Sequence, residues 1–192
     1  MAVLIEKYAQ FVDNKGQKQQ AKILINDGIF IGIDTYDDNN NHTGYMRIFF
    51  HPNNRLYLDS IYCYDEFRGS GIANYISDLA DFILSEYIGY TIRGVYEPTQ
   101  LSTDRENNIE RNIEDLDNRA KAFYKKAGYE IIGYGDYINN RSKYPNINED
   151  DFYLGEGGPA TIVAKTLKEK NHQFVIENDA IHHVNCESIK IK

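Results

Sequence analysis

The stretch from Leu56 to Tyr87 constrains the fold of this chain more than any other part of it. It predicts a strand, a tight glycine turn and a long amphipathic helix. Alternation along the strand places Tyr57, Asp59, Ile61 and Cys63 on one face, and Leu58, Ser60, Tyr62 and Tyr64 on the other. The helix carries an apolar stripe at spacings of three and four, made of Ile72, Ile76, Leu79, Ile83 and Tyr87, and Gly89 is placed to end it.

The turn between strand and helix, residues 68–73, has the features of an anion-binding loop. Backbone N–H groups at a helix start have no internal partner, and glycines let a phosphate approach them closely. Two glycines that serve chain geometry alone are the alternative reading. A dinucleotide fingerprint is disfavoured because Asn74 stands at its third small residue, and a P-loop is disfavoured because the helix start has no lysine.

The pattern Arg/Gln-x-x-Gly-x-Gly/Ala is met by Arg68, Gly71 and Ala73. Together with the preceding strand, it resembles the coenzyme A loop of the GNAT acyltransferase superfamily. A second block, from Asn118 to Tyr129, resembles the GNAT helix that carries an asparagine and a tyrosine and ends at Gly-Tyr. Asn118, Tyr124, Gly128 and Tyr129 hold those places, and the resemblance covers roughly residues 28–167.

Composition limits the class of protein. The chain has 192 residues, 42% of them hydrophobic, which suits one domain with a substantial core. A net charge of −8 argues against nucleic acid as the main partner and is compatible with a cationic substrate. Two cysteines, Cys63 and Cys186, do not make a disulfide framework, and no apolar run is long enough for a membrane span. A soluble cytoplasmic protein without membrane partners is expected.

The flanking segments read mostly as strands. We expect strands at 2–12, 21–25, 29–36 and 44–51 before the central unit, and at 90–96, 129–137 and 160–167 after it. Residues 97–117 form an acidic stretch, a helix capped by Asp117 or Asn118 ends at Gly128, and residues 138–159 form a long loop. Strand-like pieces recur in the tail at 174–176 and 189–191.

The resemblance implies an α+β fold of the three-layer sandwich type, with a mixed, mostly antiparallel sheet and helices on both faces. It implies a single domain over 1–170, with a C-terminal extension over 171–192 that packs on it or pairs with it. One departure concerns the helices that family members place between their first two strands. The segment from Phe11 to Lys22 is too short for them, so other segments must build the acceptor side.

The resemblance also implies the site. Acetyl-coenzyme A would be the co-substrate, with its pantetheine arm on the strand backbone and on Asn118, and its pyrophosphate in the loop. Tyr124 would be the general acid near the thioester sulfur. The implied cofactor-binding residues are Ile61, Tyr62, Cys63, Arg68, Gly69, Ser70, Gly71, Ile72, Ala73, Asn118 and Tyr124. No metal is expected, since His182, His183 and Cys186 lack a second ligand cluster.

Two carboxylates are candidates for the general base. Asp59 lies on the central strand, and Glu97 lies at the end of the next strand, just before Pro98. Glu97 is slightly preferred because a strand end at a cleft keeps a carboxylate within reach of substrate. The alternative for Asp59 is an ion pair with Arg93, and the alternative for Glu97 is simple solvation.

Three functions stay open. The leading hypothesis is an N-acetyltransferase that acts on a primary amine of a small molecule or a protein. The second is a catalytically silent coenzyme A-binding or interaction protein of the same fold. The third is a GNAT-type toxin that acts on charged transfer RNA, against which the acidic balance counts. A homodimer is compatible with the sequence.

Overall fold

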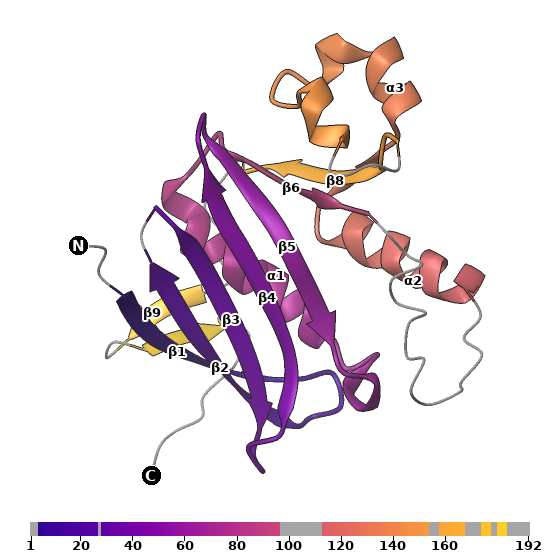
Figure 1. Cartoon of the computed structure of the whole chain (residues 1–192). Coiled ribbons are helices and arrows are strands. Elements are labelled where there is room, and N and C mark those ends of the chain that lie inside the picture. The colour runs from indigo at the N-terminus through magenta and orange to yellow at the C-terminus, as the bar shows by residue number, and fades with distance from the viewer. Residues whose placement is uncertain are drawn as a thin grey trace. The chain divides into compact units, whose positions relative to one another are not determined.

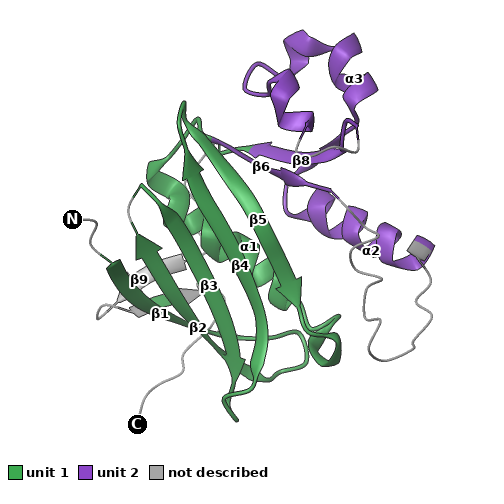
Figure 2. Ribbon diagram, viewed as in Figure 1, with its two compact units in different colours: residues 1–90, 166–192 green, residues 91–165 purple. Residues whose placement is uncertain are grey.

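The computed structural model describes residues 4–26, 28–96, 113–153, 158–167, 174–177 and 180–183. The chain divides into two compact units, residues 1–90 with 166–192, and residues 91–165 (Figure 2). Each unit is described by itself below. The boundary expected at residue 170 remains a prediction.

The first unit is built on a mixed sheet (Figure 1). Its strands follow the order β5-β4-β3-β2-β1-β10-β9, and each neighbouring pair is antiparallel except β1 with β10, which is parallel. The strands are β1 (Leu4–Val12), β2 (Lys18–Asn26), β3 (Phe30–Asp37), β4 (His42–His51), β5 (Arg55–Cys63), β9 (Phe174–Glu177) and β10 (Ala180–His183). The predicted α+β class with a mixed, mostly antiparallel sheet is confirmed, and the strand predicted at 174–176 is present.

Helix α1 (Ile72–Ile83) covers one face of this sheet, as predicted from its apolar stripe. Close approach depends on Gly44 in β4, because a Cβ there would lie 3.2 Å from Ile72 Cγ2 and 3.3 Å from Ile76 Cδ1. Alternate strand residues complete the core, including Ile23, Ile33, Met46, Ile48, Leu56 and Leu58. The α-helix is shorter than predicted, because residues Leu84–Glu86 continue as a 3-10 turn.

Strand β5 contains a bulge that changes the predicted faces. Ser60 pairs with Arg47 and Leu58 pairs with Ile48, so Asp59 is the extra residue opposite neither partner. The bulge shifts the alternation, and Ile61 and Cys63 therefore share the helix-covered face with Leu58. The prediction that placed Asp59 on the face of Ile61 and Cys63 is wrong. Asp59 lies on the opposite face and is exposed.

The second unit contains strands in the order β7-β8-β6 and two helices. Its elements are β6 (Thr91–Val95), α2 (Ile113–Lys126), β7 (Glu130–Ile132), α3 (Tyr134–Asn139) and β8 (Ile162–Thr166). A small core joins β7, α3 and β8 to the segment around Phe152, and its residues are Ile132, Tyr137, Ile147, Phe152, Ile162 and Ala164.

Two predictions for this unit are wrong. The strand expected over 129–137 ends at Ile132, and helix α3 follows it. The segment expected as a long loop carries 3-10 turns at Arg141–Lys143 and Glu149–Phe152, and Phe152 is fully buried. Burial of Tyr137 and Phe152 stabilises this segment, whereas its polar and glycine-rich sequence indicated only a loop.

Two findings concern the described residues as a whole. None of their helices has the length and apolar character needed to cross a membrane. The same residues bring together no group of three His, Cys, Asp or Glu side chains that could hold a metal ion. His182 and His183 belong to strand β10, and Cys186 lies outside the described residues.

Candidate functional site

The predicted phosphate loop forms a compact turn between β5 and α1. A 3-10 turn (Asp65–Phe67) leads into it, and Gly69 and Gly71 both have left-handed backbones, with φ of 78° and 85°. This conformation is strained for residues with a side chain, so the two glycines are required by the path of the chain. At Gly69 a Cβ would meet no heavy atom within 4 Å, so this side of the loop is open.

The start of α1 has the features that an anion needs. Gly71 is its N-cap, no side chain caps it, and its first turn carries no acidic residue. The first N–H groups of such a helix have no intrahelical partner, and the helix dipole adds partial positive charge there. The Ile72 side chain is fully buried, so this residue would contribute through its backbone. The loop and the helix start therefore fit a phosphate group.

The Arg68 side chain folds back along the loop. Its guanidinium forms an ion pair with Asp65 at 2.7 Å, and its Nε donates to the Cys63 carbonyl at 3.4 Å. It also lies over the Tyr62 ring, 5.9 Å from the centroid. These contacts bring the end of β5 and the loop together, and the ion pair with Asp65 offsets part of the positive charge of Arg68.

Ser70 is buried and turned inward. Its hydroxyl donates to the Phe67 carbonyl, and its backbone N–H donates to the same oxygen at 3.2 Å. The side chain therefore orders the loop. Any contact with a ligand near this point would come from the neighbouring glycines and from the helix start.

Cys63 is partly buried at the end of β5. Burial raises the pKa of its thiol to about 11, against the smaller opposing effects of nearby cations. A thiol with that pKa stays protonated at neutral pH and is a poor nucleophile. This agrees with a packing role for Cys63, and Ile61 and Tyr62 beside it are also partly buried.

Tyr124 lies on α2 in the second unit and packs among aromatic rings. Its ring makes edge contacts with Tyr96 at 5.9 Å and Tyr129 at 5.6 Å between centroids. Burial raises the pKa of the phenol. A tyrosine hydroxyl is protonated at neutral pH even without that shift, so Tyr124 has a proton to donate. Asn118, on the same helix, is exposed.

The start of α2 differs from the prediction. The helix begins at Ile113, so Asp117 and Asn118 lie in its second turn and cap nothing. Asp117 instead accepts the Tyr96 hydroxyl at 2.5 Å and pairs with Lys121. Burial and the hydrogen bond to Asp117 raise the pKa of Tyr96. Tyr96 thus joins the end of β6 to the helix of Tyr124, a link for which the sequence held no signal.

Of the two candidate bases, Asp59 lies among the described residues. Asp59 is exposed at the bulge of β5, and the Ser60 hydroxyl donates to it at 3.1 Å. Arg93, which was suggested as its partner, forms an ion pair with buried Asp151 at 3.0 Å within the second unit. Glu97 lies outside the described residues.

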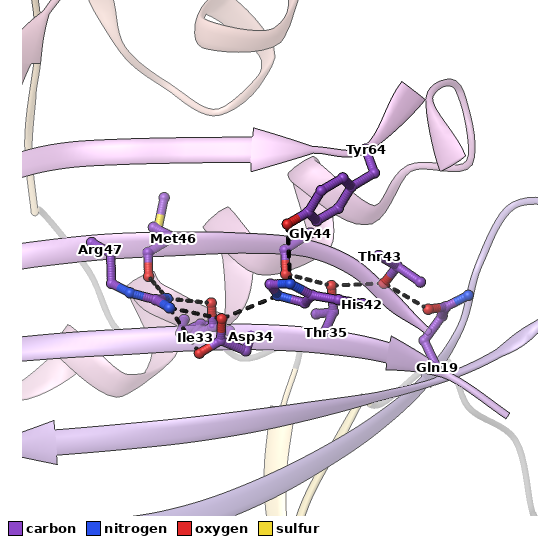
Figure 3. A network of polar contacts seen from close by, with 10 residues as sticks. All are labelled: Gln19, Ile33, Asp34, Thr35, His42, Thr43, Gly44, Met46, Arg47 and Tyr64. Atoms are coloured by element: carbon purple, nitrogen blue, oxygen red, sulfur yellow. Dashed lines mark hydrogen bonds and ion pairs between the residues drawn. The ribbon is translucent and has the colours of Figure 1, made fainter. Parts of the chain in front are cut away.

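A polar network lies on the sheet face opposite α1 (Figure 3). Asp34 on β3 accepts two hydrogen bonds from Arg47 on β4, at 2.7 and 3.0 Å. His42 bridges Asp34 and the Tyr64 hydroxyl through its two ring nitrogens, at 3.1 and 3.2 Å. Sequence reasoning missed this cluster because its members come from β3, from β4 and from the residue that follows β5, and belong to neither motif.

The architecture defines the fold. This chain has the fold of the GNAT family of acyl-coenzyme A N-acyltransferases. An acetyltransferase of that family from Staphylococcus aureus superposes with a TM-score of 0.50 over 73% of this chain and 70% of its own, at 14% identity. That likeness shows the fold alone.

Other solved structures are similar to a smaller degree. Nourseothricin acetyltransferase has a TM-score of 0.47 at 13% identity, over 87% of this chain and 89% of its own. The PaiA N-acetyltransferase of Thermoplasma acidophilum, solved in complex with coenzyme A, has a TM-score of 0.43 at 14% identity, over 72% of this chain and 61% of its own. No family model matches the chain, and no curated protein matches its sequence.

Proposed function

We propose that this protein is an N-acetyltransferase that moves an acetyl group from acetyl-coenzyme A to a primary amine of a small molecule or a protein. The observation that carries the proposal is the unit formed by β5, the glycine turn and α1. It presents an open turn at Gly69 and an uncapped helix start to an anion, in a chain with the GNAT fold. The loop would hold the pyrophosphate through backbone N–H groups.

The chemistry requires one proton to leave the acceptor and one to reach the departing sulfur. Acetyl-coenzyme A, when bound, supplies the acetyl group as an activated thioester. The acceptor ammonium must lose a proton before its nitrogen can attack, and Glu97 or Asp59 is the carboxylate proposed to take it. Tyr124 Oη holds the proton proposed for the departing thiolate, because a tyrosine phenol is protonated at neutral pH.

A second candidate function is favoured by the connections in the first unit. Strands β1, β2 and β3 are joined by short connections with turns at 13–17 and 28–29, and no α-helix among the described residues precedes α1. The helices that wall the acceptor pocket in the family therefore have no counterpart there. This favours a protein that binds coenzyme A and has lost catalysis.

A thermal-shift titration followed by a thiol-release assay separates these functions. We expect acetyl-coenzyme A to raise the melting temperature, because a ligand that binds only the native state stabilises it. We expect free thiol to appear when an accepted amine from a panel of polyamines, amino acids and lysine peptides is added. A thermal shift without amine-dependent thiol release would favour the silent binding protein. No shift at millimolar ligand would overturn both functions.

A further inference from the structure

The turn between β1 and β2, residues 13–17, is highly ordered. Asp13 N–H donates to the Gln17 carbonyl at 2.9 Å, and Gly16 N–H donates to the Asp13 carbonyl at 3.0 Å. Asp13 Oδ1 accepts the N–H groups of Lys15 and Gln17, each at 2.9 Å. These bonds close the turn on the Asp13 carboxylate, so the turn has one defined shape.

A buried chain of side chains anchors this turn to the sheet. Asp13 Oδ2 accepts Gln19 Nε2 at 3.4 Å, and Gln19 Oε1 accepts the Thr43 hydroxyl of β4 at 3.0 Å. All three residues are less than a tenth exposed, and Figure 3 shows the contact between Gln19 and Thr43. The turn is therefore held rigidly at the end of the sheet where β5 leads into the phosphate loop.

The turn rests directly on that loop. Asn14 N–H donates to the Ser70 carbonyl at 2.8 Å. The Asn14 side chain lies against Gly71, since a Cβ there would be 2.6 Å from Asn14 Nδ2 and 2.9 Å from its Cγ. An amide with two N–H donors thus lies at the N-cap of α1, next to the first free backbone N–H groups.

Lys15 follows Asn14 and is exposed. Burial raises the pKa of the Cys63 thiol at the end of β5, and the positive charges of Arg68 and Lys15 oppose that rise. Arg68 already forms an ion pair with Asp65. Lys15, on the adjoining turn, would add a second positive charge beside a diphosphate at this loop.

We propose that the turn between β1 and β2 forms a second wall of the coenzyme A phosphate site, in which the Asn14 amide and the Lys15 ammonium bind the diphosphate. This inference rests on the proposed function. It adds two residues that lie outside both sequence motifs, on a connection that is a tight turn in this chain. The competing explanation is that Asn14 only packs on Gly71 and that Lys15 is solvated.

Calorimetric titration of coenzyme A into the full-length protein tests the proposal. Lys15→Ala is expected to weaken binding about tenfold, the ordinary worth of a hydrogen bond to a charged group. Asn14→Asp keeps the shape of the side chain but places a negative charge beside the phosphates, so it is expected to weaken binding by more. Lys18→Ala is the matched control, because it removes the same charge from the same hairpin at an exposed position beyond the turn.

Salt dependence distinguishes a phosphate contact from a structural one. The affinity of the parent protein for coenzyme A should fall as sodium chloride rises, and the fall should be shallower in Lys15→Ala because one charge contact is missing. Lys15→Arg should restore both affinity and salt dependence. Circular dichroism and melting temperature confirm that each variant is folded.

The outcomes distinguish a failure of the proposed second wall from a failure of the proposed function. If the parent protein binds coenzyme A and both Lys15→Ala and Asn14→Asp bind it equally well, the second wall is wrong and the proposed function stands. Equal weakening in Lys15→Ala and Lys18→Ala would show a general charge effect and would also overturn it. If the parent protein binds no coenzyme A, the proposed function itself fails.

Discussion

Gly71 serves two purposes at the scale of a single residue. Its left-handed backbone turns the chain into α1, and its missing side chain leaves room for Asn14. Gly71→Ala is expected to cost about 1–2 kcal/mol for the backbone conformation alone, with a further cost for moving Asn14. Gly69→Ala is the matched control, because its backbone is also left-handed but its added Cβ meets open space.

Urea unfolding of the two alanine variants measures that difference. Gly71→Ala should be less stable than Gly69→Ala, and calorimetry should show that it has lost affinity for coenzyme A. Adding Asn14→Gly to Gly71→Ala should recover part of the stability, since it removes the crowded side chain. Equal stability of the two single variants would mean that the Asn14 side chain moves aside without lowering the free energy of unfolding.

Tyr124 is the residue on which the proposed proton donation depends. Tyr124→Phe keeps the packed ring and removes the hydroxyl, so acetyl-coenzyme A binding should persist while turnover falls about 10²- to 10⁴-fold. Tyr129→Phe, which alters a ring packed against Tyr124, should leave turnover unchanged. Steady-state thiol release measures both. Parent-like turnover in Tyr124→Phe would show that the proton comes from solvent.

Asp59 is a candidate base because the bulge exposes it. Asp59→Asn should remove the acidic limb of the kcat/KM profile and slow turnover more at neutral than at high pH, where the amine is already deprotonated. The profile should be recorded from pH 5.5 to 9.5 with one accepted amine. An unchanged acidic limb would show that Asp59 is not the base. The other candidate, Glu97, is tested in the same way by Glu97→Gln.

At the scale of elements, α1 connects the core to the site. Leu79 is fully buried on the face of α1 that packs against the sheet, and the same helix begins at the phosphate loop. Leu79→Ala is expected to lower the free energy of unfolding by about 2–5 kcal/mol through lost burial and the cavity left behind. Urea denaturation measures it. A decrease in the free energy of unfolding as small as that of a substitution at an exposed position would mean that the helix is not part of the core.

The bulge in β5 and the polar network on the sheet face opposite α1 both depend on how neighbouring strands pair. The bulge at Asp59 depends on how β5 pairs with β4, and the cluster of Asp34, His42 and Tyr64 depends on three strands meeting in one register. Asp34 and His42 are close because the chain reverses between β3 and β4. Local sequence patterns contain none of this information.

At the scale of the whole molecule, several carboxylates are more acidic in the folded state. Hydrogen bonds from Asn41 lower the pKa of Asp37, the Tyr134 hydroxyl lowers the pKa of Glu149, and Lys121 and Tyr96 lower the pKa of Asp117. A group whose pKa is depressed on folding stabilises the protein above its unfolded pKa. That contribution disappears as the pH falls through the folded pKa.

We therefore expect stability to decline in acid. The urea midpoint should be nearly constant from pH 7 to about pH 5 and should fall below about pH 4, the ordinary range for carboxyl groups. Asp37→Asn should make the fall shallower, because it removes one of these groups. A midpoint that stays constant down to about pH 2.5 would show that these carboxylates do not contribute.

The sequence by itself determined the central unit and the class of fold. The strand, the glycine turn and the start of α1 follow from hydrophobic periodicity and glycine chemistry, which act over a few residues. The end of α2 just before Gly128, whose backbone is left-handed, follows for the same reason. The roles of the individual site residues remain predictions.

Tertiary structure decided what depends on contacts between distant segments. The bulge at Asp59 depends on how β5 pairs with β4. The contact of Asn14 with Gly71 and the hydrogen bond from Tyr96 to Asp117 each join residues that are far apart in the chain. The segment around α3 and Phe152 became ordered because its few apolar side chains share a core with β7 and β8. Such pairings depend on register and packing, which no local pattern of residues specifies.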